Sequence, residues 1–230
     1  MTVVSLKPGN SCSNGTVKVE FSDGSSLLLS TNYLPGDGSN EGENSAFWGT
    51  LPCGAAAGIP GWELPRELSS GEEEAFRFAA ACYRAEKIAL RLIARAEQSS
   101  LGLTAKLERR GFEASAANAV VSRLLDRNLL DDERYAALWV RSRLALKKAP
   151  SPRWLLAALR KRGIDRESSR KALDKALDPE TEYALFLRFL ESRSFREKSL
   201  LSGGERASFL RTQLKYEGFS SETLDRYFDD

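Results

Sequence analysis

The stretch KLERRGF at residues 106–112 decides the fold, because the chain contains it three times in varied form. It returns as ALRKRGI at 158–164 and as QLKYEGF at 213–219. The three glycines, Gly111, Gly163 and Gly218, are 52 and 55 residues apart. This spacing is too long for a turn motif and suits one compact supersecondary unit, so we expect an internal repeat.

The local meaning of the repeated stretch is the end of a helix. Glycine accepts a left-handed conformation at little cost just after the last helical turn, and the apolar residue that follows can fold back onto that turn. Serine or aspartate caps and apolar residues at helical spacing indicate the remaining boundaries. The predicted helices span about 70–98, 103–110, 113–127, 132–148, 152–162, 165–177, 178–193, 205–217 and 220–228.

The N-terminal part has the pattern of strands. VKVEFS and SLLLS flank Asp23 and Gly24, and an Asp-Gly pair between β-prone runs is a strong hairpin signal. Val3, Val4, Ser5 and Leu6 can add a third strand. Gly, Ser, Pro and Asn then dominate, which predicts a long loop or linker with Phe47, Trp48 and Trp62 as tethering contacts.

The predicted fold class is mainly α, with about nine helices in tandem three-helix repeats after a small N-terminal β-hairpin or short antiparallel sheet. Five segments follow from this division: the hairpin at 1–34, the linker at 35–68 and repeats at 69–130, 131–177 and 178–230. One repeat of this size is marginal alone, so neighbouring repeats should share core. The long helix near residue 80 has an apolar face suited to a partner or a membrane surface, but we expect it to pack within the chain.

Composition weighs against an enzyme. The chain of 230 residues has no histidine, which removes the commonest general base and metal ligand. Its three cysteines, Cys12, Cys53 and Cys82, are too widely spaced for a zinc site or a disulfide framework. No Gly-rich phosphate loop is present, so we expect no cofactor and no metal. Asp131, Asp132 and Glu133 fit the capped start of a helix better than a metal site.

The charge is divided unevenly along the chain. Residues 75–177 carry 23 basic and 11 acidic residues, whereas residues 1–70 have a net charge of −4 and residues 178–230 a net charge of −3. A basic middle suggests a polyanionic or acidic partner, and a solvated helical surface is the alternative. No stretch approaches eighteen uninterrupted apolar residues, so we expect a cytoplasmic protein that does not bind membranes.

The order of these motifs resembles the RecX family of regulatory proteins. The similarity is strongest over residues 85–177, through KLERRGF, LLDDERYA and the threefold repetition. It departs from the family at LALKKAPSPRW and at the Gly-rich segment from 35 to 62, which looks like an insertion. The resemblance implies tandem three-helix repeats, no enzymatic activity, and a modulator that binds the RecA nucleoprotein filament and restrains its ATP hydrolysis and strand exchange. It also implies that single- or double-stranded DNA is a partner, and we expect a monomer.

The resemblance and the basic charge together indicate one binding face on the first two repeats. Its predicted residues are Lys106, Arg109, Arg110, Arg153, Trp154, Arg160, Lys161 and Arg162. Long cationic side chains contact carboxylates and phosphates without one fixed geometry, and Arg near an exposed Trp suits stacking. The alternative is that these cations only compensate helix C-terminal dipoles. A DNA-binding module without a recombinase partner is the second functional hypothesis.

Overall fold

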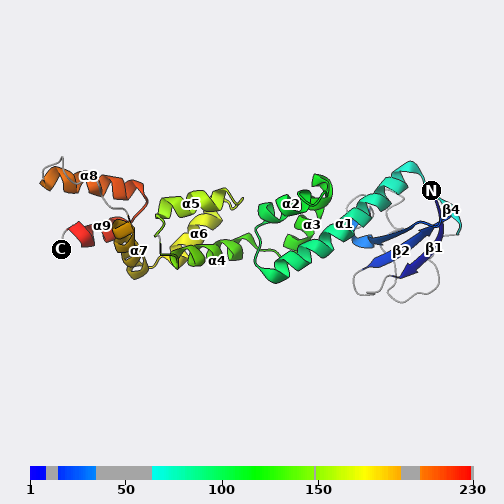
Figure 1. Cartoon of the computed structure of the whole chain (residues 1–230), viewed down its shortest axis with the longest axis horizontal. Coiled ribbons are helices and arrows are strands. Elements are labelled where there is room, and N and C mark those ends of the chain that lie inside the picture. The colour runs from blue at the N-terminus through cyan, green and yellow to red at the C-terminus, as the bar shows by residue number, and fades with distance from the viewer. Residues whose placement is uncertain (9–14, 35–63, 148, 193–202, 229–230) are drawn as a thin grey trace. The chain divides into compact units, whose positions relative to one another are not determined.

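The computed structural model describes residues 1–8, 15–34, 64–147, 149–192 and 203–228 (Figure 1). The chain forms two compact units. The first comprises Met1–Ala96 and Leu103–Leu129, and the second comprises Glu97–Gly102 and Leu130–Asp230. The predicted tethering residues Phe47, Trp48 and Trp62 lie outside the described residues. The division into five segments stays a prediction.

A four-stranded antiparallel sheet opens the first unit. Its strands are β1 (Thr2–Pro8), β2 (Thr16–Phe21), β3 (Ser26–Ser30) and β4 (Arg66–Glu67), in the order β3-β2-β1-β4. The β2–β3 hairpin turns at the predicted place, where Gly24 has a φ of +80° and Asp23 accepts a hydrogen bond from the Ser25 amide. The predicted short sheet is confirmed. The fourth strand, β4, lies in the segment predicted as a linker. The sequence did not indicate this strand, because two residues are too few to show an alternating pattern.

The core of the sheet packs on the long helix α1 (Ser70–Arg95) (Figure 1). Val3, Val19 and Leu29 point to this helix from the three long strands and are buried with Phe76 and Ala79. The predicted packing of this helix within the chain is therefore confirmed. Small side chains on α1 let the helix approach the sheet closely.

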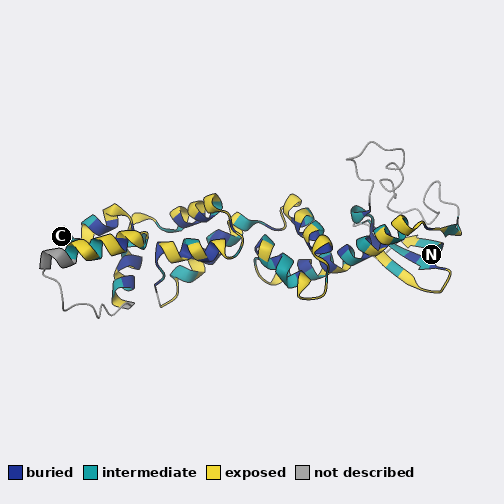
Figure 2. Ribbon diagram, turned by 90° about the horizontal axis from the view of Figure 1, so that it is seen from above, coloured by how far each residue is buried: buried dark blue, intermediate teal, exposed yellow. Residues whose placement is uncertain are grey.

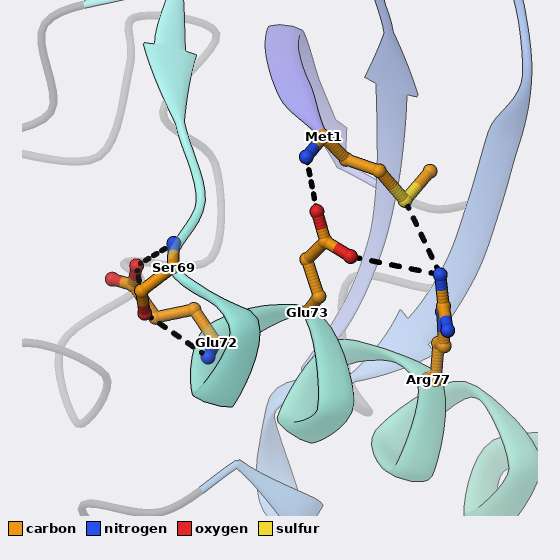
Figure 3. Close-up of polar contacts among 5 residues, drawn as sticks. All are labelled: Met1, Ser69, Glu72, Glu73 and Arg77. Carbon is orange, nitrogen blue, oxygen red and sulfur yellow. Dashed lines mark hydrogen bonds and ion pairs between the residues drawn. The ribbon is translucent and has the colours of Figure 1, made fainter.

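The start of α1 is held by a capping box (Figure 3). The Ser69 hydroxyl accepts from the Glu72 amide, and the Glu72 carboxylate accepts from the Ser69 amide and hydroxyl. These donors lower the pKa of the Glu72 carboxyl below its ordinary value. One residue further, Glu73 pairs with the amino group of Met1 and with Arg77, which ties β1 to the first turns of α1.

The C-terminal half of α1 packs on α3 (Ala114–Asp126), which follows α2 (Ser100–Glu108). Burial raises the pKa of the Cys82 thiol to about 12. Arg123 of α3 lies 3.9 Å from the Glu86 carboxylate, and its guanidinium lies over the ring of Tyr33, 5.5 Å from the centroid. Tyr33 ends the short 3-10 helix η2 (Thr31–Tyr33), so this contact fixes the end of the hairpin to the helices.

Six helices make up most of the second unit. They are α4 (Asp132–Leu144), α5 (Pro152–Arg160), α6 (Arg166–Ala176), α7 (Pro179–Ser192), α8 (Gly203–Tyr216) and α9 (Ser221–Phe228). Trp139, Leu155 and Leu159 lie in the core of α4 to α6, whereas Phe186 and Phe219 lie in the core of α7 to α9. The three-helix grouping predicted from the repeats is confirmed.

The segment 97–102 is fastened to α4. The amide and hydroxyl of Ser100 donate to the Asp132 carboxylate at 2.8 and 2.6 Å. The Arg134 guanidinium donates to both carboxylate oxygens of Glu97 at 2.8 and 3.2 Å. Asp131 caps α4 by accepting from the Arg134 amide, as predicted for one of the two aspartates.

The repeated stretch ends α2, α5 and α8 in the same way. Gly111, Gly163 and Gly218 have φ angles of +86°, +83° and +92°. In each case the next amide, that of Phe112, Ile164 or Phe219, donates back to the carbonyl of the repeated leucine at 3.2 to 3.4 Å. The glycine amide donates to the backbone carbonyl of the residue after that leucine, and the two hydrogen bonds together form a Schellman motif. All three leucines are buried, so in each copy the repeated leucine anchors the end of its helix in the hydrophobic core.

The described residues contain nine α-helices, close to the predicted ones. The structure differs in detail: α2 begins at Ser100 rather than at Leu103, and Gly203 and Gly204 lie in the first turn of α8 rather than in a loop. Leu138 of α4 is 45% exposed. Within the described ranges, no helix has both the length and the apolar character needed to cross a membrane.

Candidate partner-binding surface

The candidate surface is built on α4 and α5. Between Glu133 and Asp165 the chain contains no acidic residue. The Ser151 hydroxyl accepts from the Trp154 amide and caps α5, while Pro152 occupies the first turn. These two features fix the start of α5, so Arg153 and Trp154 leave the helix at its first turn, where both are exposed.

Two tryptophans form the centre of this surface. The rings of Trp139 on α4 and Trp154 on α5 are stacked, with centroids 6.0 Å apart and planes at 24°. Trp139 is 8% exposed and belongs to the core, whereas Trp154 is 51% exposed. The inner indole therefore braces the outer one, which presents a large apolar face to solvent.

Two guanidinium groups lie against the inner indole. Arg162 lies 4.4 Å and Arg143 lies 5.1 Å from the centroid of the Trp139 ring. The Nε atom of Arg143 is buried and has no hydrogen-bond partner among the described residues. Arg162 also donates to the Ala158 carbonyl at 2.7 Å, which caps the end of α5. Positive charge thus accumulates beside an aromatic pair.

A cation–π pair lies at the start of α5, next to Trp154 in the chain. The Arg153 guanidinium lies 3.6 Å from the centroid of the Tyr216 ring at the end of α8, and Tyr216 is 68% exposed. The Arg153 amide donates to the Glu217 carbonyl at 2.9 Å, and this bond holds the two helix ends together. A Cβ atom at Gly218 would lie 3.2 Å from the Arg153 nitrogen, which shows how closely the two segments approach.

The remaining predicted residues divide between the two units. Arg160 and Lys161 are exposed at the end of α5. Lys106, Arg109 and Arg110 belong to the first unit, at the end of α2. Arg109 and Arg110 donate to the carbonyls four residues before them, so they compensate the helix end, as the alternative hypothesis predicted. Each guanidinium keeps further donors after one such bond.

Sequence reasoning predicted Trp154 as a surface residue but missed its contact with Trp139, and it missed Arg143 and Tyr216. The run without acidic residues could have pointed to Arg143. Nothing local pointed to Tyr216, because its contact with Arg153 joins two repeats. Within the described part of the chain, no three His, Cys, Asp or Glu side chains are placed to bind a metal ion.

Comparisons with known proteins agree with this architecture. The family model for the first three-helix domain of RecX matches residues 85–124, and the model for the second matches residues 131–173, which contain α4 and α5. The chain is 40% identical to Regulatory protein RecX of Treponema pallidum (strain Nichols) over 114 residues, which are 50% of this chain and 69% of that protein. It is 32% identical to Regulatory protein RecX of Syntrophotalea carbinolica over 143 residues, which are 62% of this chain and 92% of that protein.

A solved structure described as the crystal structure of regulatory protein RecX shares the fold. It matches with a TM-score of 0.64 and 16% sequence identity, over 100% of this chain and 99% of the other. The relatives carry the name of a regulatory protein, which agrees with the prediction that this chain is not an enzyme. The family models, the relatives and the fold agree, and the chain belongs to the RecX family of regulatory proteins.

Proposed function

We propose that this protein binds the RecA nucleoprotein filament and inhibits its ATP hydrolysis and strand exchange. Membership of the RecX family supports the regulatory role, and the resemblance to that family supplies RecA as the partner. A regulator that binds one conformation of the filament more tightly shifts the filament toward that conformation. In this proposal the conformation that the regulator prefers is one that hydrolyses ATP slowly, so the turnover of the filament falls.

The exposure of the Trp154 indole, together with its stacking on Trp139, is the observation that supports a docking site on α5. Residues that contribute most to protein interfaces are enriched in Trp, Tyr and Arg and lie in a well-packed surrounding. Trp154 is half exposed, is braced by Trp139, and has Arg153 beside it in the chain. Bracing keeps the indole in one orientation before binding, so less conformational freedom is lost on docking.

The cations at the ends of α2 and α5 supply charge complementarity in this proposal. Lys106, Arg109, Arg110, Arg160 and Lys161 lie at the ends of α2 and α5, and Glu108 is the one acidic residue within residues 106–110 and 160–161. Such groups raise the association rate with an acidic partner and suppress wrong partners more than they add affinity. We therefore assign steering to these cations and the larger share of affinity to Trp154.

The test is the ATPase activity of RecA on single-stranded DNA. The charge-reversal variant changes Arg109, Arg110, Arg160 and Lys161 to Glu. A control set of exposed cations elsewhere, Arg127, Arg170, Lys175 and Lys215, is changed to Glu in a second variant with the same net charge. We expect the first variant to lose inhibition and the second to keep it. Unchanged inhibition by a folded charge-reversal variant would show that the proposed cations do not dock.

The second candidate function is a DNA-binding module that acts without RecA. The exposed face of Trp154 beside cations is also the arrangement that stacks an unpaired base and holds its phosphates. Tight binding to naked DNA with a steep dependence on salt, together with no effect on RecA, would favour this function.

A further inference from the structure

A row of cations on α1 has no role in the proposed docking surface. Exposed and buried residues alternate along this helix (Figure 2), and its C-terminal half exposes Arg84, Lys87, Arg91 and Arg95. We call these four residues the α1 ridge. Lys87 lies 5.2 Å from the centroid of the Tyr83 ring, and among the described residues no ion pair joins any of the four to a carboxylate.

Helix geometry places the ridge on one side of α1. Successive residues are rotated by about 100°, so Arg84, Arg91 and Arg95 lie within about 40° of one another and Lys87 about 60° to one side. The rise of 1.5 Å per residue puts Lys87, Arg91 and Arg95 about 6 Å apart along the axis. Lys87, Arg91 and Arg95 are therefore regularly spaced along one side of the helix, as phosphates are along a nucleic acid strand.

The ridge is not neutralised by its own helix. Between Glu74 and Glu97 the only acidic residue is Glu86, and that carboxylate faces Arg123 of α3 on the packed side. Like charges three and four residues apart repel one another on a helix surface. Only Arg95 lies in the last turn, where the helix dipole favours a cation. A bound polyanion would remove this repulsion, and helix stability alone does not explain the other three residues.

The composition of the ridge favours nucleic acid over protein. The centre of a protein interface is enriched in aromatic residues and depleted in charge, as it is around Trp154. Surfaces that bind nucleic acid are more polar and much more positively charged. Beside the ridge, Leu90 is the only exposed large apolar residue in the C-terminal half of α1 among the described residues.

We infer that α1 binds the phosphate backbone of nucleic acid through Arg84, Lys87, Arg91 and Arg95, without reading base sequence. This site belongs to the first unit, whereas Trp154 and the cations at the end of α5 belong to the second. It does not require the RecA partner. The four side chains contact phosphates through their positive charge. The counterions that the nucleic acid releases on binding supply most of the binding free energy.

The experiment measures binding of the whole protein to fluorescent oligonucleotides across a range of salt concentrations. The ridge variant carries Arg84→Gln, Lys87→Gln, Arg91→Gln and Arg95→Gln. A matched variant changes the control set of Arg127, Arg170, Lys175 and Lys215 to Gln. Each is tested on two single strands of unrelated sequence and on one duplex of equal length.

The expected result is a change in the salt dependence. Each lost phosphate contact makes the plot of log K against log salt less steep by about 0.7 for single strands and about 0.9 for duplex. Four lost contacts therefore reduce the steepness by about 2.8 for single strands and about 3.6 for duplex. At low salt the ridge variant should bind at least roughly tenfold more weakly, equally for both sequences. The matched variant should change the slope by less than about 1. A variant with Arg84→Lys, Arg91→Lys and Arg95→Lys should keep the full slope.

Equal slopes for the ridge variant and the matched variant would overturn the proposal. It would also be overturned if the ridge variant lost RecA inhibition while its binding to naked DNA stayed unchanged, because the ridge would then bind protein. Folding is checked by circular dichroism and urea unfolding, and Gln suits a helix about as well as Lys or Arg. If the fourfold variant unfolds, Arg91→Gln alone should lower the slope by about 0.7 to 0.9. If the ridge variant binds DNA as the matched variant does, the proposal that Trp154 docks on RecA is unaffected.

Discussion

Trp154 lies on Trp139 with the two indole planes at 24° and the centroids 6.0 Å apart, although the residues belong to different helices. Trp139 is buried in the core of α4 to α6, so the core itself sets the orientation of Trp154. An exposed aromatic side chain that is held by a buried one is ordered before any partner arrives. The contact therefore links the stability of the second repeat to its proposed binding surface.

Truncating Trp154 should weaken RecA inhibition strongly and lower the stability of the fold only a little. For Trp154→Ala we expect the concentration for half-inhibition of RecA ATPase to rise at least about tenfold, because a central aromatic contributes a large share of binding free energy. Leu125→Ala is the control, since Leu125 is an exposed apolar residue of α3, outside the two helices of the candidate surface. Similar inhibition curves for the two variants would contradict the assignment.

Truncating Trp139 should act mainly on stability. Its side chain is buried, so Trp139→Ala should lower the free energy of unfolding by about 3 to 5 kcal/mol. Trp139→Phe keeps an aromatic ring under Trp154 and should cost less. Urea unfolding followed by circular dichroism measures both. A smaller loss for Trp139→Ala than for Trp154→Ala would mean that the core does not depend on this indole.

The three repeated glycines should differ in their tolerance of alanine. All have positive φ, but a Cβ atom at Gly111 meets nothing within 4 Å, at Gly218 it meets the Arg153 nitrogen at 3.2 Å, and at Gly163 it meets the Leu101 Cβ at 2.5 Å. Gly111→Ala should cost only the left-handed strain of about 1 to 2 kcal/mol. The loss of unfolding free energy should then increase from Gly111→Ala to Gly218→Ala to Gly163→Ala. Equal losses would show that the neighbours simply move aside.

Stability should fall at alkaline pH through Cys82. Burial raises the pKa of its thiol from 9.0 to about 12 in the folded state, so the neutral thiol favours folding. This contribution is complete below pH 9 and is lost as the pH rises toward 12. Tyr33 acts in the same direction, because burial raises its pKa too. Urea unfolding between pH 8 and 11 should show a decline that Cys82→Ala makes shallower.

An unchanged pH dependence in Cys82→Ala would show that the thiolate is not disfavoured in the folded protein. The comparison is made at the same temperature and salt, and the slope against pH rather than the absolute stability is compared. The mutation also removes buried volume, which lowers stability equally at every pH.

Much of the fold could be predicted because its signals are local. The turn at Asp23 and Gly24, the caps at Ser69 and Ser151, and the glycine after each repeated leucine all act within a few residues. Strand β4 could not be predicted in this way, since its two residues pair with β1 more than sixty positions away.

Three Schellman-capped helices at a repeating interval and a basic middle of the chain could be predicted from the residue order alone, because capping and charge depend on near neighbours. Which of those cations meet an aromatic ring became known from the packing of the helices. Arg143 in the last turn of α4 and Arg162 just after α5 both reach the ring of Trp139, and Arg153 of α5 meets Tyr216 at the end of α8. Such contacts depend on how helices pack, and packing joins residues whose separation along the chain carries no signal.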